Sequence, residues 1–436
     1  MELQNKNIKN EKIKKDSSGS DGLTQDTEIR NNCFDCETES TISDTVSDAA
    51  GSRDSEQQKN GRKKKEGRIK RLRRNGFFKK YFVVLFWVFV SSILVYTLSR
   101  LSPPFAEFWA RYLSLPIRFI LAKISDIFQF SIAEWVIISL PLIAIFYIAA
   151  SFHSTKKDES PQNFYKWIRA PLSLIMAIGI IFFAGFGPSY GRYRLSENLG
   201  IEQEKVSAQD LYDTAVKVND LLSEELDSIR FGDGGASVMP YGYDTLVRKT
   251  NEAFEKYAEK ADYITYFSSY PKPIALSGPM TYTHISGVYT FMTGESNINI
   301  NYPDFLIPYT MAHEMSHQRG IAREDEANFV AFLVCLESDD SYIRYSGYAN
   351  MLDYLGDALY SADKKLYSEF RNKYMPQSLK NEYSSFSAFF RKYADSTASH
   401  VTGSVNNAFL QSQGQSHGIK SYGLVVDLAV AYFKQH

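Results

Sequence analysis

Two histidines and a glutamate in the C-terminal half have the types and spacing to bind and use a metal ion. They lie in the pentad His313-Glu314-Met315-Ser316-His317. Residues four apart share one face of an α-helix, so both imidazoles could be directed at one divalent ion. Glu314 follows the first histidine and could reach a water bound to that ion. The pattern therefore predicts a zinc site formed by His313 and His317, with Glu314 as general base.

The segment after the pentad supplies a third ligand. A catalytic zinc usually has three protein ligands and leaves the fourth position for water. Gly320 is a natural end for the first helix, and Glu324, Asp325 and Glu326 form the acidic first turn of a second helix. We expect Glu324 to be the ligand, with Glu326 and Asp325 as alternatives. Acidic residues also favour helix N-termini where no metal binds, so the cluster alone does not decide.

Three other residues are candidates for supporting roles. Asn328 follows Glu324 by one helical turn and could hydrogen-bond to it, because metal ligands are usually held by a second set of polar groups. Tyr345 and His417 could donate to the oxygen that becomes negative during peptide hydrolysis. The alternatives are a place in the core for Tyr345 and an exposed loop for His417.

A region rich in β-branched and aromatic residues comes shortly before the pentad. Residues 263–300 are interrupted by several prolines and glycines, which predicts a small sheet. A strand at 287–300 would offer an edge along which an extended peptide could add as a further strand. Asn297 and Asn299 would then face one side of this strand and could contact the substrate.

Composition limits the other possibilities. The chain has 436 residues and a formal net charge of -1, so no overall positive field predicts a nucleic-acid partner. Of the three cysteines only Cys33 and Cys36 are close in sequence, which rules out a disulfide framework for the folded part. Their spacing is that of half a zinc knuckle, but no second pair or nearby histidine completes it. We expect no small-molecule cofactor besides the metal ion.

The first part of the chain divides into a polar tail and a membrane region. Residues 1–75 are rich in charged and small polar side chains and end in a basic run, which predicts a disordered tail. Apolar stretches follow at about 81–98, 132–150 and 168–186, each close to the ~20 residues that a helix needs to cross a bilayer. A membrane region at 76–189 with three transmembrane helices is therefore predicted.

The distribution of basic residues predicts the orientation. The densest basic run, residues 61–74, precedes the first span, and cytoplasmic flanks of membrane helices are usually rich in Lys and Arg. Three crossings would place the N-terminus in the cytoplasm and residues 190–436 outside the cell membrane, in a multi-pass protein. The basic run would also contact anionic membrane lipid. Residues 103–129, between the first two spans, mix aromatic and charged side chains in the manner of helices at a membrane surface.

Helical periodicity dominates the last part of the chain. Ser207 precedes an apolar-periodic run as a helix N-cap does, and residues 243–261 form a second amphipathic pattern. Helical pattern returns after residue 300 and persists to the end. The predicted fold class is α+β and mainly helical, with N-terminal transmembrane helices followed by a metal-binding domain that contains a small sheet.

The metal motif and its surroundings also resemble a known group of proteins. HEMSHQRGIAREDEANFVAFLVC (313–335) looks like the metal-site signature of gluzincin-type zinc peptidases, and closely like that of an uncharacterised family of bacterial membrane proteins in that clan. The segments 271–300, 344–355 and 418–433 are similar to recurrent blocks of that family. The likeness covers roughly residues 81–436 and implies a membrane-tethered, zincin-like peptidase fold. In related membrane peptidases an Asp stands where this chain has Asn328.

The predicted activity follows from the expected ion. Zinc lowers the pKa of a bound water toward ~7 and polarises a peptide carbonyl, and Glu314 would take the proton. This predicts a membrane-anchored zinc peptidase that hydrolyses a protein or peptide outside the membrane. One alternative is a catalytically inactive, zinc-stabilised scaffold or sensor. Another is an intramembrane protease, which the position of the pentad outside the expected spans disfavours.

Overall fold

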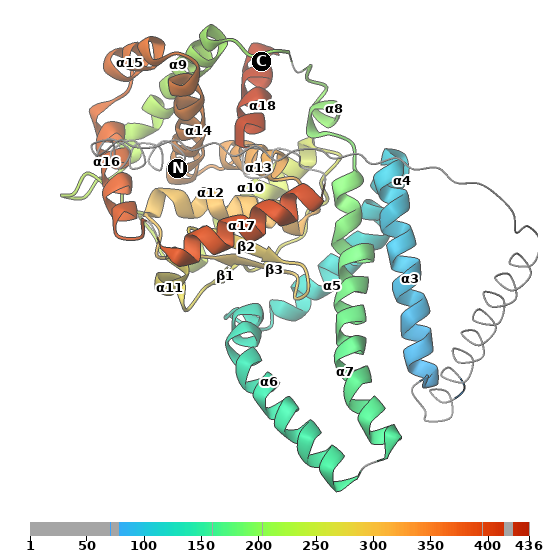
Figure 1. The fold of residues 1–436 in the computed structure, drawn as a ribbon. Helices are drawn as coiled ribbons and strands as arrows, with labels where there is room; N and C mark the ends of the chain where they lie inside the picture. The colour runs from blue at the N-terminus through green and yellow to red at the C-terminus, as the bar shows by residue number, and fades with distance from the viewer. Residues whose placement is uncertain are drawn as a thin grey trace, which may run out of the picture. The chain divides into compact units, whose positions relative to one another are not determined.

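The structure is a computed structural model, shown in Figure 1, that describes part of the chain. The described residues are Lys70, 78–158, 160–202, 204–394, 396–413 and 422–435. The tail predicted at 1–75 lies almost entirely outside them, as do Cys33, Cys36 and His417.

Contacts within the chain divide it into two units. One unit comprises Met1–Val83 and Ser151–Pro171, and the other comprises Val84–Ala150 and Leu172–His436. The histidine pentad, the sheet and the helices around them all belong to the second unit. The candidate site therefore lies within this unit.

Three helices are long and apolar enough to cross a membrane. They are Lys80–Leu101 (α3), Ile132–Lys157 (α6) and Pro161–Gly191, where α7 (Pro161–Ile180) continues through a π-helix (Ile181–Phe186, η2) into a 3-10 turn (Gly187–Gly191, η3). Most of their large apolar side chains are exposed, which suits a surface that faces lipid. The prediction of three apolar helices is confirmed by length and composition, and each helix extends beyond its predicted bounds. Their orientation in a membrane stays a prediction.

The segment between α3 and α6 is helical and packs onto the C-terminal part of the chain. It consists of Pro103–Phe108 (α4), a π-helix at Trp109–Ser114 (η1) and Leu115–Ser125 (α5). Arg192 Nη2 forms an ion pair with Glu107 Oε1 at 2.7 Å, and Arg111 Nη1 donates to the Asp262 carbonyl at 2.7 Å. The sequence predicts this segment as helices at a membrane surface. These contacts join the segment to residues far along the chain.

Helices also form most of the remaining chain. Ser207 caps its helix as predicted, since its hydroxyl accepts a hydrogen bond from the Asp210 N–H. The described helices are Leu195–Leu199 (α8), Ala208–Glu225 (α9), Tyr243–Lys260 (α10), Ser277–Thr281 (α11), Ile307–Gln318 (α12), Glu324–Leu336 (α13), Ser341–Ala362 (α14), Lys364–Lys373 (α15), Gln377–Arg391 (α16), Thr397–Ser412 (α17) and Tyr422–Gln435 (α18), with 3-10 turns at Leu226–Ser228 and Asp304–Leu306.

The core of the second unit is built around α13. Every residue of this helix from Asp325 to Cys335 is buried, and α10, α12, α14 and α18 pack around it. Helix α14 also packs along α9, and Figure 1 shows these two helices side by side. A helix that is apolar on all sides is stable only when it is enclosed in this way. The enclosure fixes the first turn of α13, where Glu324 lies.

The sheet has three short strands in the order β1-β3-β2. Its strands are Lys272–Pro273 (β1), Gly287–Thr290 (β2) and Glu295–Ile298 (β3), with β1 parallel and β2 antiparallel to β3. The single strand predicted at 287–300 is therefore a hairpin, which turns at Gly294 with φ of 71°. Helix α12 packs against β2 and β3. The fold is thus mainly helical with a small sheet, which confirms this part of the predicted fold class.

Candidate metal centre

Helix α12 presents the pentad and ends in a tight turn. Gly320 has φ of 93°, a conformation that glycine adopts without steric penalty. The Gly320 N–H donates to His317 O at 2.9 Å and the Ile321 N–H donates to Ser316 O at 3.1 Å, which is the pairing of a Schellman turn. The helix end predicted at Gly320 is confirmed. The turn directs the chain back toward α13 within a few residues.

Three side chains from these two helices converge. The Nε2 atoms of His313 and His317 lie 3.0 Å apart. Glu324 Oε2 lies 3.3 Å from His313 Nε2, and Glu324 Oε1 lies 3.6 Å from His317 Nε2. The structure thus brings together the two histidines and the acidic residue that the sequence selects as the third ligand.

These separations fit a divalent metal. Tetrahedral ligands at ~2.1 Å from a zinc ion lie about 3.4 Å from one another. Two imidazole nitrogens and a carboxylate oxygen are also donors that zinc accepts. Within the described part of the chain, these three residues form the group whose ligand atoms lie close enough together to hold a metal ion.

The turn after α12 orients one of the imidazoles. His317 Nδ1 lies 2.7 Å from the Ile321 carbonyl oxygen, and because a carbonyl can only accept, Nδ1 carries a proton. Nε2 is then the ring nitrogen directed at the converging group, as in histidines that bind metals. Burial would lower the pKa of His317, but the charges of Glu324 and Glu314 outweigh it and raise that pKa to about 9. Burial would raise the pKa of the Glu324 carboxyl, but His317 and His313 outweigh burial and hold that pKa well below the usual range.

Glu314 lies beside the three ligands without being one of them. Its side chain is buried, and Oε2 has no hydrogen-bond partner among the described residues. Burial raises the pKa of its carboxyl, whereas the charges of His313 and His317 and the backbone N–H of Tyr289 act in the opposite direction. A carboxylate with a free oxygen next to a metal site is positioned to accept a proton from a bound water.

The free edge of the sheet runs past this carboxylate. The Asn299 N–H donates to Ser286 O at 2.8 Å, and bonded pairs alternate along an antiparallel ladder. Val288 pairs with Asn297 in the same register, so the backbone groups of Val288 are directed toward β3. Gly287 and Tyr289 therefore direct their backbone groups away from β3, where the Tyr289 N–H donates to Glu314.

The alternative acidic ligands have other partners. Glu326 Oε1 accepts from the Leu195 N–H at 3.1 Å and from Arg323 Nη1 at 2.9 Å. Asp325 is buried, and burial together with the charge of Glu326 raises its pKa to about 6. Asn328 is also buried, and its backbone and side-chain oxygens accept hydrogen bonds from the Tyr309 hydroxyl. The structure does not place Asn328 in a hydrogen bond with any of the three converging side chains.

Tyr345, Asn297 and Asn299 have other partners, and His417 lies outside the described residues. Tyr345 is buried in the core, where its hydroxyl donates to Glu382 Oε2 at 3.0 Å. Asn297 lies in the central strand β3, so the edge position expected for it belongs to β2 instead. Its amide donates to the carbonyl oxygens of Val288 and Glu295, and Asn299 likewise donates within the sheet region. Their roles in catalysis and substrate binding stay predictions.

The end of the third apolar helix forms one wall of the centre. The ring of Phe186 meets the ring of His317 edge to face at 6.5 Å and lies 5.2 Å from the ring of Tyr289. Tyr190 is buried next to Phe186 and lies close enough to Glu324 to interact with its charge. Sequence reasoning assigned these aromatic residues no role in the site, because nothing in the sequence indicates that residues 186–190 approach α12.

Arginines fasten this wall to the turn between the ligand helices. Arg323 Nη2 donates to the carbonyl oxygens of Tyr190 and Arg192 at 2.9 and 3.0 Å. Arg192 Nη1 in turn donates to the Gly320 carbonyl at 3.2 Å. Both guanidinium groups are largely buried, and buried charged donors are stable only when their hydrogen bonds are made. The ligands and the end of the apolar helix are therefore held as one structure.

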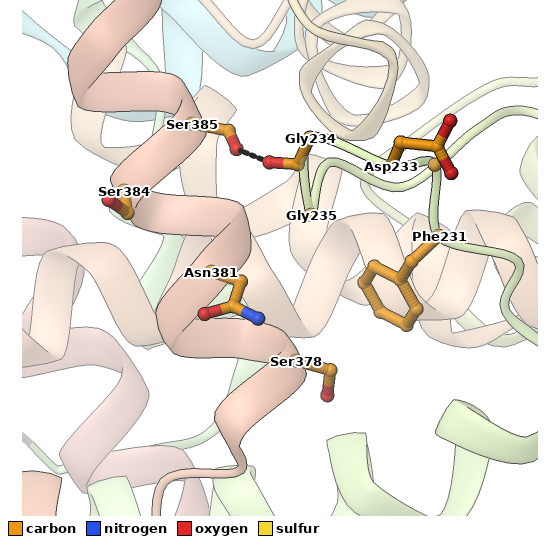
Figure 2. Close-up of a pocket in the computed structure, with 9 residues that line it drawn as sticks. Phe231, Asp233, Gly234, Gly235, Ser378, Asn381, Ser384 and Ser385 are labelled. Atoms are coloured by element: carbon orange, nitrogen blue, oxygen red, sulfur yellow. Dashed lines mark hydrogen bonds between the residues drawn. The ribbon is translucent and has the colours of Figure 1, made fainter.

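A separate pocket of about 490 Å³ lies between the loop at 231–235 and α16. Figure 2 shows the glycine-rich turn of this loop passing over α16, where Ser385 Oγ donates to Gly234 O at 2.5 Å. Gly235 has φ of 77°, and a β-carbon there would come within 2.8 Å of Asn381 Cβ. None of the three converging side chains lines this pocket.

Comparison with known proteins places the chain in a family. Residues 109–430 match the family described as "Protein of unknown function (DUF3810)". The match includes the second and third apolar helices, the sheet and all three candidate ligands. No curated protein and no solved structure matches the chain. Because the match covers more than half of the sequence, the chain belongs to the DUF3810 family.

Proposed function

We propose that the protein is a membrane-anchored, zinc-dependent peptidase. The observation that carries this proposal is the convergence of His313, His317 and Glu324, with ligand atoms 3.0 to 3.6 Å apart. The Glu314 Oε2 atom beside them, which has no hydrogen-bond partner among the described residues, supports hydrolysis rather than a purely structural ion. A structural zinc usually has four protein ligands, whereas three are brought together here.

The residues divide the work of hydrolysis between them. Zinc, when bound, supplies a Lewis acid that polarises a peptide carbonyl and lowers the pKa of water toward ~7. His313, His317 and Glu324 hold it, and Ile321 fixes the tautomer of His317 through its carbonyl. Glu314 accepts the proton of the attacking water and passes it to the amine that leaves. Burial of Glu314 excludes bulk water from this proton transfer.

The edge strand β2 is the proposed binding site for the substrate backbone. Gly287 offers an outward-directed N–H and C=O beside Glu314, and Tyr289 offers an outward-directed C=O, since its N–H donates to Glu314. An extended peptide could add to this edge and pass its scissile bond over the ligands. Backbone pairing of this kind recognises a polypeptide and imposes little side-chain preference, which fits a protein or peptide substrate.

The membrane setting completes the proposal. The N-terminus is proposed to be cytoplasmic and the metal centre extracytoplasmic, on the basis of the basic run at 61–74. Phe186 and Tyr190, at the end of the third apolar helix, contact the centre, so cleavage would occur close to the membrane surface. The gluzincin-type fold implied by the resemblance of residues 313–335 is part of this proposal.

The test is metal content and cleavage by the full-length protein in detergent. We expect about one zinc per chain and cleavage of casein, an unfolded probe. Glu314→Gln should keep the zinc and lose activity by a factor on the order of 10² to 10⁴, the usual contribution of a general base. Glu252→Gln, an exposed glutamate in α10 paired with Arg248, is the matched control and should cleave normally.

Two results would contradict the proposal. One is full activity in Glu314→Gln, which would remove the proposed general base. The other is a zinc-loaded wild-type protein that is inactive on casein and on a pool of unrelated unfolded peptides. That second result would favour a zinc-stabilised scaffold or sensor.

A further inference from the structure

Helix α17 lies on the protein surface yet carries no charged side chain. Residues 397–412 contain no Asp, Glu, Lys or Arg, whereas the helices α15 and α16 just before it carry all three of Lys, Arg and Glu. Leu410 is the one residue of α17 that is buried. An exposed helix in water is normally rich in charge, so this surface is suited to a different environment.

The exposed surface of α17 has an apolar stripe. Val401, Val405 and Phe409 follow one another at intervals of four residues and therefore share one side of the helix. Their exposed fractions are 59%, 64% and 40%. Ser404 and Gln411 are exposed as well but lie on the adjoining polar side. The helix is thus amphipathic within the part of its surface that the protein leaves uncovered.

The stripe continues the surface of the apolar helices. The ring of Phe409 packs at 6.3 Å from Phe182, in the π-helical end of the third apolar helix, and at 6.4 Å from Tyr190. At the end of α17, Gln413 Oε1 accepts a hydrogen bond from the Tyr96 hydroxyl of α3 at 2.8 Å. Two of the three helices that could cross a membrane therefore hold the C-terminal end of α17.

We propose that α17 lies along the membrane surface and inserts Val401, Val405 and Phe409 into the lipid. An uncharged helix fixed beside two apolar helices meets the boundary between headgroups and acyl chains, where its apolar side is removed from water and its Ser and Asn residues stay hydrated. Phe409 also packs on Tyr190 beside the metal centre, but the proposal does not depend on peptidase activity.

The experiment places an environment-sensitive fluorophore on α17 in the full-length protein. Cys33 and Cys36 are replaced by Ser, while Cys335 is fully buried and remains unlabelled. NBD is attached at Val401→Cys or Val405→Cys, and the protein is reconstituted in phosphatidylcholine and phosphatidylglycerol vesicles with or without brominated lipid. Ser404→Cys and Gln411→Cys are the matched controls on the polar side. Leu142→Cys, an exposed position of α6, reports that reconstitution succeeded.

The proposal predicts a difference between two sides of one helix. NBD at 401 and 405 should show blue-shifted emission and lose intensity when brominated lipid is present, whereas NBD at 404 and 411 should show neither change. Equal spectra at 405 and 411, with quenching at 142 intact, would overturn the proposal. Blue-shifted emission at 405 that brominated lipid does not quench would also overturn it, since it would mean that protein covers the stripe.

Discussion

The α-carbon of Gly287 in β2 faces the carboxylate of Glu314 in α12. A β-carbon at residue 287 would lie 2.6 Å from Glu314 Oε1, 2.7 Å from Glu314 Cγ and 2.9 Å from Thr310 Cγ2. Side-chain atoms do not approach one another this closely, so only glycine lets the edge strand and the ligand helix pack at this distance. The free edge of the sheet and the proposed general base are thus positioned together.

Replacing Gly287 by Ala should therefore impair cleavage more than folding. The new methyl group would displace the Glu314 carboxylate, and a shift of about 1 Å in a catalytic group can reduce the rate on the order of 100-fold. The zinc content should stay the same, because the atoms nearest to the new methyl group belong to Glu314 and Thr310 and not to the three ligands. The measurements are kcat/KM on casein and zinc per chain.

Gly278→Ala provides the control, since a β-carbon at residue 278 would meet no atom within 4 Å. We expect this variant to behave as the wild type. A Gly287→Ala protein that binds zinc and cleaves at the normal rate would show that Glu314 does not act from the position described.

Glu324→Gln and Asp325→Asn should separate the third ligand from its neighbour. The Gln variant keeps the shape of residue 324 but removes the charge next to His313 and His317, so zinc affinity should fall. The loss of zinc affinity should exceed the roughly 10- to 100-fold loss caused by removing a residue that hydrogen-bonds to a metal ligand. Asp325→Asn should bind zinc normally, because Asp325 is not among the three side chains whose ligand atoms converge. Equal zinc loss in both variants would exclude Glu324 as the specific ligand.

Acid should abolish the contribution of one helix cap. Asp340 caps α14 by accepting from the N–H groups of Tyr342 and Ile343, and its second oxygen pairs with Lys249 at 2.8 Å. Burial would raise the pKa of Asp340, but Lys249, Tyr241 and the helix N–H groups outweigh it and lower the pKa below the usual range. A carboxyl whose pKa is lowered by folding stabilises the protein above its unfolded pKa, which is about 3.9, and loses that effect as pH falls through the folded value.

Asp340→Ala should therefore lower the free energy of unfolding by about 1 to 2 kcal/mol at pH 7. The difference from wild type should shrink as the pH falls below about 4, where the unfolded carboxyl takes up its proton, and should be lost as the pH falls through the lower folded pKa. Denaturant unfolding of the full-length protein at both pH values measures this. Asp339→Ala, at the exposed acid next to it, should change little at either pH. A difference that does not depend on pH would show that the charge of Asp340 contributes nothing.

The arrangement of the candidate ligands could be predicted from sequence because it is local. His313 and His317 are one helical turn apart, and Gly320 ends the helix so soon that Glu324 must start the next one nearby. The N-cap of α9 was predictable for the same reason, since it depends on a few adjacent residues.

Features that depend on distant contacts could not be predicted in this way. Strand β2 carries strand-forming residues but β3 is Glu-Ser-Asn-Ile, so composition does not reveal that the chain turns at Gly294 and pairs these two segments. The approach of Phe186 and Tyr190 to the ligands joins segments more than a hundred residues apart. Such contacts depend on how the apolar helices pack on the rest of the unit. The periodicity of residues within one segment does not specify that packing.

Tyr345 is the position where sequence and structure suggest different roles, and one substitution distinguishes them. The hydroxyl donates to Glu382 Oε2, which also accepts from the Ser237 N–H at 2.9 Å. Tyr345→Phe removes one partner of a buried carboxyl, so the free energy of unfolding should fall by about 1 to 3 kcal/mol. Zinc content and kcat/KM on casein should stay at wild-type values, because the hydroxyl is engaged with Glu382 in the core. A large loss of kcat with unchanged stability would instead support the role at the developing oxyanion, and would require Tyr345 to leave Glu382 when substrate binds.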